Sequence, residues 1–255
     1  EIYQCDWSSD VCSSDLQLSE ISRLQGDLPR AAAVTQDYLA TVRRAEREEP
    51  GAWVSQSLSA ALDQAATIAS AQRDWRGAQA FAEAALRIDQ TRLAEQPNDY
   101  MRRLYLAIAW GRLDAVRTNL GEAAGALTAR EESVRLLRAL VGDAPHFVQA
   151  RHNFGVAAFN LSLKRRAAGE GAVALQLLQE ADQQYVALTA LDPENVRYRE
   201  VHVRVLDALA QESNPSVARP ALERARALIA TLPPPAPGEA AERRRMEFYL
   251  AYNAW

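Results

Sequence analysis

Cysteine and histidine, the residues that most often bind metals or act as nucleophiles and bases, are few in this sequence, and their spacing does not suit a site. The two cysteines, Cys5 and Cys12, stand among Ser and Asp, without the closely spaced pairs and further ligands of a metal site. His146 and His152 are six residues apart, whereas two ligands on one helix face are usually three or four apart. His202 lies far from both in the sequence. The sequence therefore predicts no metal site.

Catalytic motifs are likewise missing. The Gly-Glu-Gly stretch at 169–171 is too short for a phosphate-binding loop and follows no expected strand. Neither a nucleophile elbow nor a His-Glu-x-x-His pattern occurs in the sequence. Trp75 and Trp110 could form a ligand cage, but their spacing favours core packing. We expect no catalytic residue and no cofactor, and hence no enzyme activity in this chain.

The composition and a repeated pattern indicate the elements that would position any site. Ala and Leu dominate and β-branched residues are few, which is typical of helices. Prolines recur at 50, 97, 145 and 193, with spacings of 47, 48 and 48 residues. A second set of positions keeps the same period, and each is followed five residues later by alanine: Gly26, Arg73, Gly121 and Gly169, then Ala31, Ala78, Ala126 and Ala174. A fixed period of this size predicts stacked supersecondary units.

Each unit is predicted to be two antiparallel helices. The first begins at the proline turn, as in 98–120, where apolar residues are spaced three and four apart. The second runs from the Gly or Arg turn toward the next proline, as in 123–142. Asp192, before Pro193, is the expected N-cap of one first helix. The fold class predicted from these patterns is all-α.

This pattern resembles the tetratricopeptide (TPR) repeat family. With Gly121 on the turn glycine, Trp110, Leu113 and Ala126 fall on the family's aromatic, leucine and alanine positions. Asp114 and Ser162 replace the packing glycine, Arg117 and Arg165 replace the tyrosine, and the period is about 48 residues rather than 34. The extra length gives two additional turns to each helix, which leaves the buried face unrotated. The resemblance implies an α-solenoid of antiparallel helix hairpins over about residues 20–232.

The opening segment, 1–16, differs from the rest of the chain. Reverse translation of Cys5–Leu16 resembles a common sequencing-library adapter, so we interpret 1–16 as a non-native, adapter-derived segment. The expected organisation is then a repeat domain at 17–232, a Pro-rich loop at 233–238 and a terminal or truncated capping helix at 239–255. An adapter joined to coding sequence also predicts that the chain is a fragment, which leaves a lost signal peptide or an upstream catalytic domain open.

The corrected charge balance excludes some function classes. The opening segment holds four of the 33 acidic residues, and its removal leaves as many acidic residues as Lys and Arg together. Such a balance disfavours nucleic-acid binding, which normally needs a basic excess. No apolar run approaches the length of a membrane span. The remaining chain has no cysteine and one lysine, Lys164, against many arginines, which indicates a cytoplasmic protein from a GC-rich bacterium.

The resemblance implies a non-catalytic scaffold that binds a protein or peptide on the concave face of the array. First-helix residues would line that face, and the candidate partner-binding residues are Gln64, Arg112, Asn153, Asn160 and Lys164. The Lys and Asn pattern of chaperone-tail clamps is missing, because Asp63, Gly111 and Phe159 stand at one clamp position and Thr67, Ala115 and Leu163 at the other. The alternative is a regulatory or sensor segment of a larger bacterial signalling enzyme, such as a serine/threonine protein kinase. The sequence does not indicate the oligomeric state.

Overall fold

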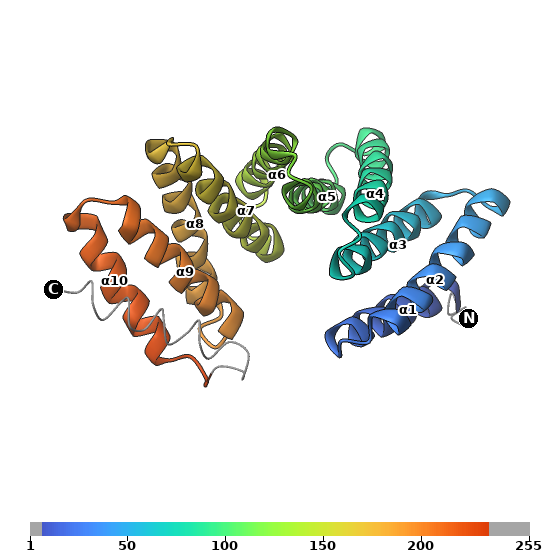
Figure 1. Ribbon diagram of the computed structural model, residues 1–255, viewed down its shortest axis with the longest axis horizontal. Coiled ribbons are helices and arrows are strands. Elements are labelled where there is room, and N and C mark those ends of the chain that lie inside the picture. The colour runs from blue at the N-terminus through green and yellow to red at the C-terminus, as the bar shows by residue number, and fades with distance from the viewer. Residues whose placement is uncertain (1–6, 235–255) are drawn as a thin grey trace. The chain divides into compact units, whose positions relative to one another are not determined.

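The computed structural model describes residues 7–234, with side chains from Ser14 onward, as ten α-helices without strands. They form five consecutive helix hairpins (Figure 1). The first helices of the hairpins are α1 (Trp7–Leu24), α3 (Ala52–Ala71), α5 (Tyr100–Asn119), α7 (Val148–Ala167) and α9 (Val196–Glu212). The second helices are α2 (Leu28–Glu48), α4 (Trp75–Glu95), α6 (Ala123–Asp143), α8 (Gly171–Leu191) and α10 (Pro215–Ala230). The predicted all-α hairpin array is therefore confirmed.

The chain divides into two compact units within α6. The N-terminal unit ends at Ser133 and contains α1 to α5 with the first half of α6. The C-terminal unit begins at Val134 and contains the rest of α6 with α7 to α10. Within the units, each second helix also packs against the first helix of the next hairpin, as α2 does with α3, α4 with α5 and α8 with α9. Stacking of this kind covers the apolar face of each hairpin with its neighbour.

The turn inside four of the hairpins depends on one left-handed residue. The φ angles are 82° at Gly26, 62° at Arg73, 79° at Gly121 and 81° at Gly169. The next residue's N–H bonds back to a carbonyl five residues earlier, as Asp74 does to Ala69 at 2.8 Å, which is the Schellman way of ending a helix. Glycine adopts this backbone without a side-chain clash, so Arg73 holds the least favourable of the four turns. The repeated marker in the sequence is thus the turn residue.

The proline turns lie between hairpins, and the helices start a few residues beyond the prolines. Asp99 caps α5 by accepting from the N–H groups of Met101 at 2.8 Å and Arg102 at 3.1 Å. Asn195 caps α9 in the same way through Tyr198 N–H at 3.2 Å. The expectation that Asp192 is this N-cap is wrong, because Asp192 is the C-cap of α8. The chain needs the residues from Pro193 to Asn195 to reverse direction before α9 begins.

The four repeated alanines lie where the two helices of a hairpin approach closely. Ala31, Ala78, Ala126 and Ala174 are completely or almost completely buried. Ala78 belongs to a small cluster with Ala69 of α3 and Val116 of α5. A larger apolar cluster of the N-terminal unit joins α2, α3 and α4, and one of the C-terminal unit joins α8, α9 and α10. The core therefore runs between helix layers within each unit.

The first helix, α1, extends into the opening segment. It begins at Trp7, so the first hairpin starts ten residues before the expected domain boundary at residue 17. Leu16, the last residue of the adapter-like segment, is half-buried against the apolar cluster of α2 and α3. A helix formed by the following residues can lengthen at little cost once its first turn exists. The origin of residues 1–16 stays a prediction, and most of the Pro-rich loop and the helix expected at 239–255 lie outside the described residues.

At two places in the repeat, the side chains that meet between the two helices of a hairpin change together from one hairpin to another. In α7, Gly155 lies under the ring of Tyr185 from α8, and a Cβ placed there would stand 2.6 Å from the ring atom Cε2. One repeat earlier, the same two positions are Ala107 and Leu137. The small partner thus accompanies the large one, as close packing requires.

The second matched position holds a buried ion pair in one hairpin alone among the four that the repeat aligns. Asp114 of α5 occupies the place of the packing glycine, and Arg130 of α6 donates from Nε to its Oδ2 at 2.7 Å. Both are buried, with side-chain exposures of 3% for Asp114 and 10% for Arg130. The equivalent residues are Ser19 with Thr35, Ala66 with Ala82, and Ser162 with Leu178. A buried ion pair therefore stands where the other three aligned hairpins have uncharged side chains.

Candidate binding groove

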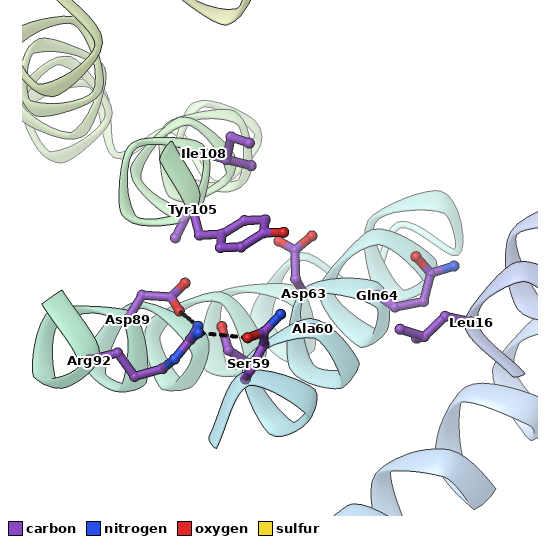
Figure 2. A pocket seen from close by; sticks show the side chains of 11 residues that line it. Leu16, Ser59, Ala60, Asp63, Gln64, Asp89, Arg92, Tyr105 and Ile108 are labelled. Carbon is purple, nitrogen blue, oxygen red and sulfur yellow. Dashed lines mark hydrogen bonds and ion pairs between the residues drawn. The ribbon is translucent and has the colours of Figure 1, made fainter. Parts of the chain in front are cut away.

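A groove lies in the N-terminal unit between α3 and α5, with α4 beneath it (Figure 2). It holds two pockets, of about 280 and 390 Å³, which share Gln56, Arg92 and Tyr105. The smaller pocket is further lined by Leu16, Ser59, Ala60, Asp63, Gln64, Asp89, Ile108 and Ala109. The larger is further lined by Ala52, Trp53, Asp99, Met101 and Arg102. First helices of the hairpins thus supply most of the lining.

A buried ion pair from α4 forms the floor. Asp89 is 4% exposed and Arg92 is 5% exposed. Arg92 donates from Nη1 to Asp89 Oδ1 at 3.2 Å and from Nη2 to Gln56 Oε1 at 3.1 Å, as the dashed lines in Figure 2 show. Its Nε–H is buried and has no acceptor among the residues that the structure describes. The groove therefore contains a desolvated hydrogen-bond donor that remains unused.

In the floor of the groove, the cost of burying the Asp89 carboxylate is only partly offset by its neighbours. Burial raises the pKa of Asp89 above its ordinary value, because removal from water disfavours the charged carboxylate. The hydrogen bond from Ser59 and the charge of Arg92 act in the opposite direction without cancelling this effect. Both charges of the pair thus face a low-dielectric environment, where contacts with a bound group are stronger than in water.

The larger pocket combines apolar side chains with a second arginine. Arg102 donates from Nη1 to the main-chain carbonyl of Arg92 and, at 3.1 Å, to Glu95 Oε2. It thereby ties the start of α5 to the end of α4. Trp53 and Met101 are 39% and 40% exposed, which is high for such side chains. This part of the groove offers exposed apolar surface beside guanidinium groups.

The opposite end of the groove is closed by contacts between successive first helices. Arg112 of α5 forms a two-point ion pair with Asp63 of α3, in which Nη2 lies 2.7 Å from Oδ2. Gln64 of α3 donates to the hydroxyl of Ser19 in α1 at 3.1 Å. These polar side chains therefore join neighbouring hairpins as well as facing the groove.

Comparisons with known proteins agree with this architecture. No protein-family model and no curated protein sequence matches the chain. The crystal structure of BtubC (BKLC) from P. vanneervenii superposes with a TM-score of 0.64 over 89% of this chain and 84% of that one, at 17% sequence identity. A putative kinesin light chain from Podosopora anserina, with nearly identical TPR-like repeats, gives a TM-score of 0.57 over 86% of this chain and 94% of that one, also at 17% identity. The fold is TPR-like.

The TPR-like array places the five predicted binding residues in both units. Gln64 and Arg112 belong to the N-terminal unit, and Gln64 lines the smaller pocket. The other three, Asn153, Asn160 and Lys164, lie on one helix, α7, in the C-terminal unit. Asn153 donates to the Gln149 carbonyl at 2.8 Å, and Asn160 and Lys164 are half-buried. That all five residues form one binding row stays a prediction.

Asp89, Arg92 and Tyr105 were missed by the sequence interpretation. The signal was present, because Asp89 and Arg92 fall on the apolar face of α4. Aligned by the repeat, the position of Asp89 holds Val42, Leu137 and Tyr185, and the position of Arg92 holds Ala45, Leu140 and Leu188. Two adjacent charges at positions that are otherwise apolar would have indicated the floor of the groove.

The histidines of the C-terminal unit contact aromatic and charged groups. Among the described side chains, no group of three or more His, Cys, Asp and Glu could hold a metal ion. His152 Nδ1 lies 3.2 Å from the hydroxyl of Tyr185, whose ring stacks on His202 on its other side. His202 Nε2 lies 2.8 Å from Asp182 Oδ1, and Arg224 donates to the same carboxylate. Burial would raise the pKa of Asp182, but these two partners together lower it.

His152 should make the stability of the protein depend on pH. Burial lowers the pKa of His152, and Arg197 adds to this effect, so the folded chain keeps the imidazole neutral where the unfolded chain already binds a proton. Neutral His152 contributes fully to the free energy of unfolding above about pH 6.5, the ordinary pKa of histidine in the unfolded chain. This contribution is lost as the pH falls toward the lower pKa of His152 in the folded chain. Urea unfolding between about pH 7.5 and 5.5 should therefore show a smaller loss of stability for His152→Gln than for the natural chain. The exposed His146→Gln is the control, and an equal pH slope in the natural chain and His152→Gln would contradict the prediction.

No described helix combines the length and apolar character needed to span a membrane.

Proposed function

We propose that the chain is a non-catalytic scaffold that binds a protein segment along the first-helix face of the TPR-like array. The groove between α3 and α5 carries this proposal, since it joins exposed apolar surface to a buried, unsatisfied donor. Concave sites that combine apolar surface with a few fixed polar groups are typical of ligand binding. Gln64 and Arg112 lie at one end of the groove, and the other proposed contacts, Asn153, Asn160 and Lys164, lie on α7, a first helix of the C-terminal unit.

Substitution of the row residues tests the proposal. Peptides enriched from a displayed library of random peptides by the natural chain should bind Arg112→Ala and Asn160→Ala about tenfold more weakly, which is the usual effect of losing one hydrogen bond with a charged or polar group. Affinity would be measured by calorimetry, and helicity by circular dichroism. Arg138→Ala is the matched control, because Arg138 also forms an ion pair, at 2.7 Å to Glu180, but on second helices.

The outcome separates binding from folding. Loss of affinity in Arg112→Ala with unchanged helicity supports the first-helix face as the binding surface. Unchanged affinity in both variants, or an equal loss in Arg138→Ala, would contradict it. The alternative function, a regulatory segment of a larger bacterial signalling enzyme, stays a prediction from the sequence.

A further inference from the structure

We infer that the groove of the N-terminal unit binds an electrically neutral partner segment with an aromatic or large aliphatic side chain. The apolar side chain would pack against Trp53 and Met101, and a main-chain or side-chain amide carbonyl would accept the free Nε–H of Arg92. The inference rests on the proposed function and specifies the chemistry of the partner. It differs from carboxylate recognition, for which the expected clamp residues are missing.

The unused donor of Arg92 is the first observation. A guanidinium has five N–H donors, and within residues 7–234 Arg92 forms side-chain hydrogen bonds only to Asp89 and Gln56, neither through Nε. A buried donor without an acceptor is costly, and a bound carbonyl would remove that cost. Arg92 lines both pockets, so a ligand in either one lies beside its guanidinium, which must turn toward the groove to offer the covered Nε–H.

The local charge balance is the second observation. Each arginine of the groove already has its own carboxylate: Arg92 pairs with Asp89, Arg112 with Asp63, and Arg102 with Glu95 at 3.1 Å and with Asp99 at 3.7 Å. The four carboxylates outnumber the three guanidinium groups. An incoming carboxylate would meet no uncompensated positive charge, and the buried Asp89 would repel it. A neutral amide carbonyl meets the same donor without this repulsion.

The apolar side chains are the third observation. Trp53 and Met101 stand exposed at the starts of α3 and α5. The ring of Tyr105 lies over the floor of the groove, with its hydroxyl toward Asp63 (Figure 2). Aromatic side chains and methionine are the residues that most often hold the apolar anchor of a partner. The larger pocket, about 390 Å³, is large enough for one such side chain.

Two probes that differ in one charge test the inference. N-acetylphenylalanine amide is neutral at both ends, whereas N-acetylphenylalanine carries a carboxylate. We expect the amide to bind with at least about threefold higher affinity and to shift the NMR signals of the Arg92 Nε–H group and the Trp53 indole N–H. Titrations at low and high salt should give nearly equal affinities for the amide, because no charge is gained or lost.

Two variants locate the binding. Arg92→Lys removes the Nε donor and keeps the positive charge, and should weaken binding of the amide probe about tenfold. Arg87→Lys is the matched control on the exposed side of the same helix, α4. Because a change at the buried Arg92 could disturb folding, Trp53→Ala serves as a second variant at a half-exposed position and should also weaken binding.

Each outcome has a distinct meaning. Equal or tighter binding of the carboxylate probe would overturn the inference while leaving the groove as a binding site. Binding of neither probe would overturn the inference and contradict the groove as the site of the proposed function. Binding of the amide that is unaffected by Arg92→Lys and Trp53→Ala would place the ligand elsewhere and overturn the inference as well.

Discussion

Replacement of Asp114 by Ser should lower the free energy of unfolding by about 3–5 kcal/mol, because it leaves Arg130 as a buried charge without a carboxylate. The pair is well shielded, with Arg130 Nη2 at 2.6 Å from Asp114 Oδ2 and both side chains largely buried. Arg130 also donates to the main-chain carbonyl of Gly111 at 3.4 Å, a long bond that cannot replace the ion pair. Urea unfolding followed by circular dichroism would measure the loss.

The chain itself provides the control for this prediction. Combining Asp114→Ser with Arg130→Leu gives the residues that the next hairpin has at the same positions, Ser162 and Leu178. Replacement of a buried ion pair by side chains that pack well is often neutral or stabilising. The double variant should therefore recover most of the stability lost in Asp114→Ser. A double variant as unstable as the single one would show that the ion pair itself, rather than the unpaired charge, determines the stability of this hairpin.

The second large effect is expected at Gly155. Alanine is favoured over glycine by about 1 kcal/mol in the interior of a helix, so Gly155→Ala would stabilise α7 if space allowed it. The added Cβ would lie 3.2 Å from Cδ2 of Tyr185, which is tight, and 2.6 Å from Cε2, which is closer than carbon atoms can pack. We expect a net loss of about 1–3 kcal/mol, as is usual for overpacked cores, measured by urea unfolding.

A double-mutant cycle tests the cause of that loss. Gly155→Ala with Tyr185→Leu reproduces Ala107 and Leu137, which occupy these two positions one repeat earlier. Tyr185→Leu alone removes a buried ring and its contact with His152, and should itself be destabilising. In the double variant the clash is absent. The sum of the stability losses in the two single variants should therefore exceed the loss in the double variant, and the difference, the coupling energy, should be about 1 kcal/mol or more. Additive losses would show that Tyr185 is not the obstacle.

The sequence alone predicted the bounds of two helices to within two residues. The helix expected at 123–142 is observed as Ala123–Asp143, and the one expected at 98–120 as Tyr100–Asn119. This accuracy has a physical reason: a hairpin needs a residue that tolerates positive φ at its turn and an alanine where its helices approach closely. Those local requirements recur with each repeat and are therefore visible in the sequence. Exact caps were less predictable, as Asp192 shows, because several polar residues near a turn can each cap a helix.

The binding groove was only partly predictable. Gln64 and Arg112 could be placed on the first-helix face by register, but their contacts with Ser19 and Asp63 join residues more than 40 positions apart. Register also shows that Asp89 and Arg92 occupy apolar positions, yet it does not show what compensates their charges. Only the packing of α3, α4 and α5 places Gln56 beside Arg92, leaves the Nε of Arg92 without an acceptor in the described part of the chain and exposes Trp53 in the same pocket. Local sequence preferences thus determine the repeat, whereas the pairing and burial of polar groups depend on contacts that form only when the hairpins stack.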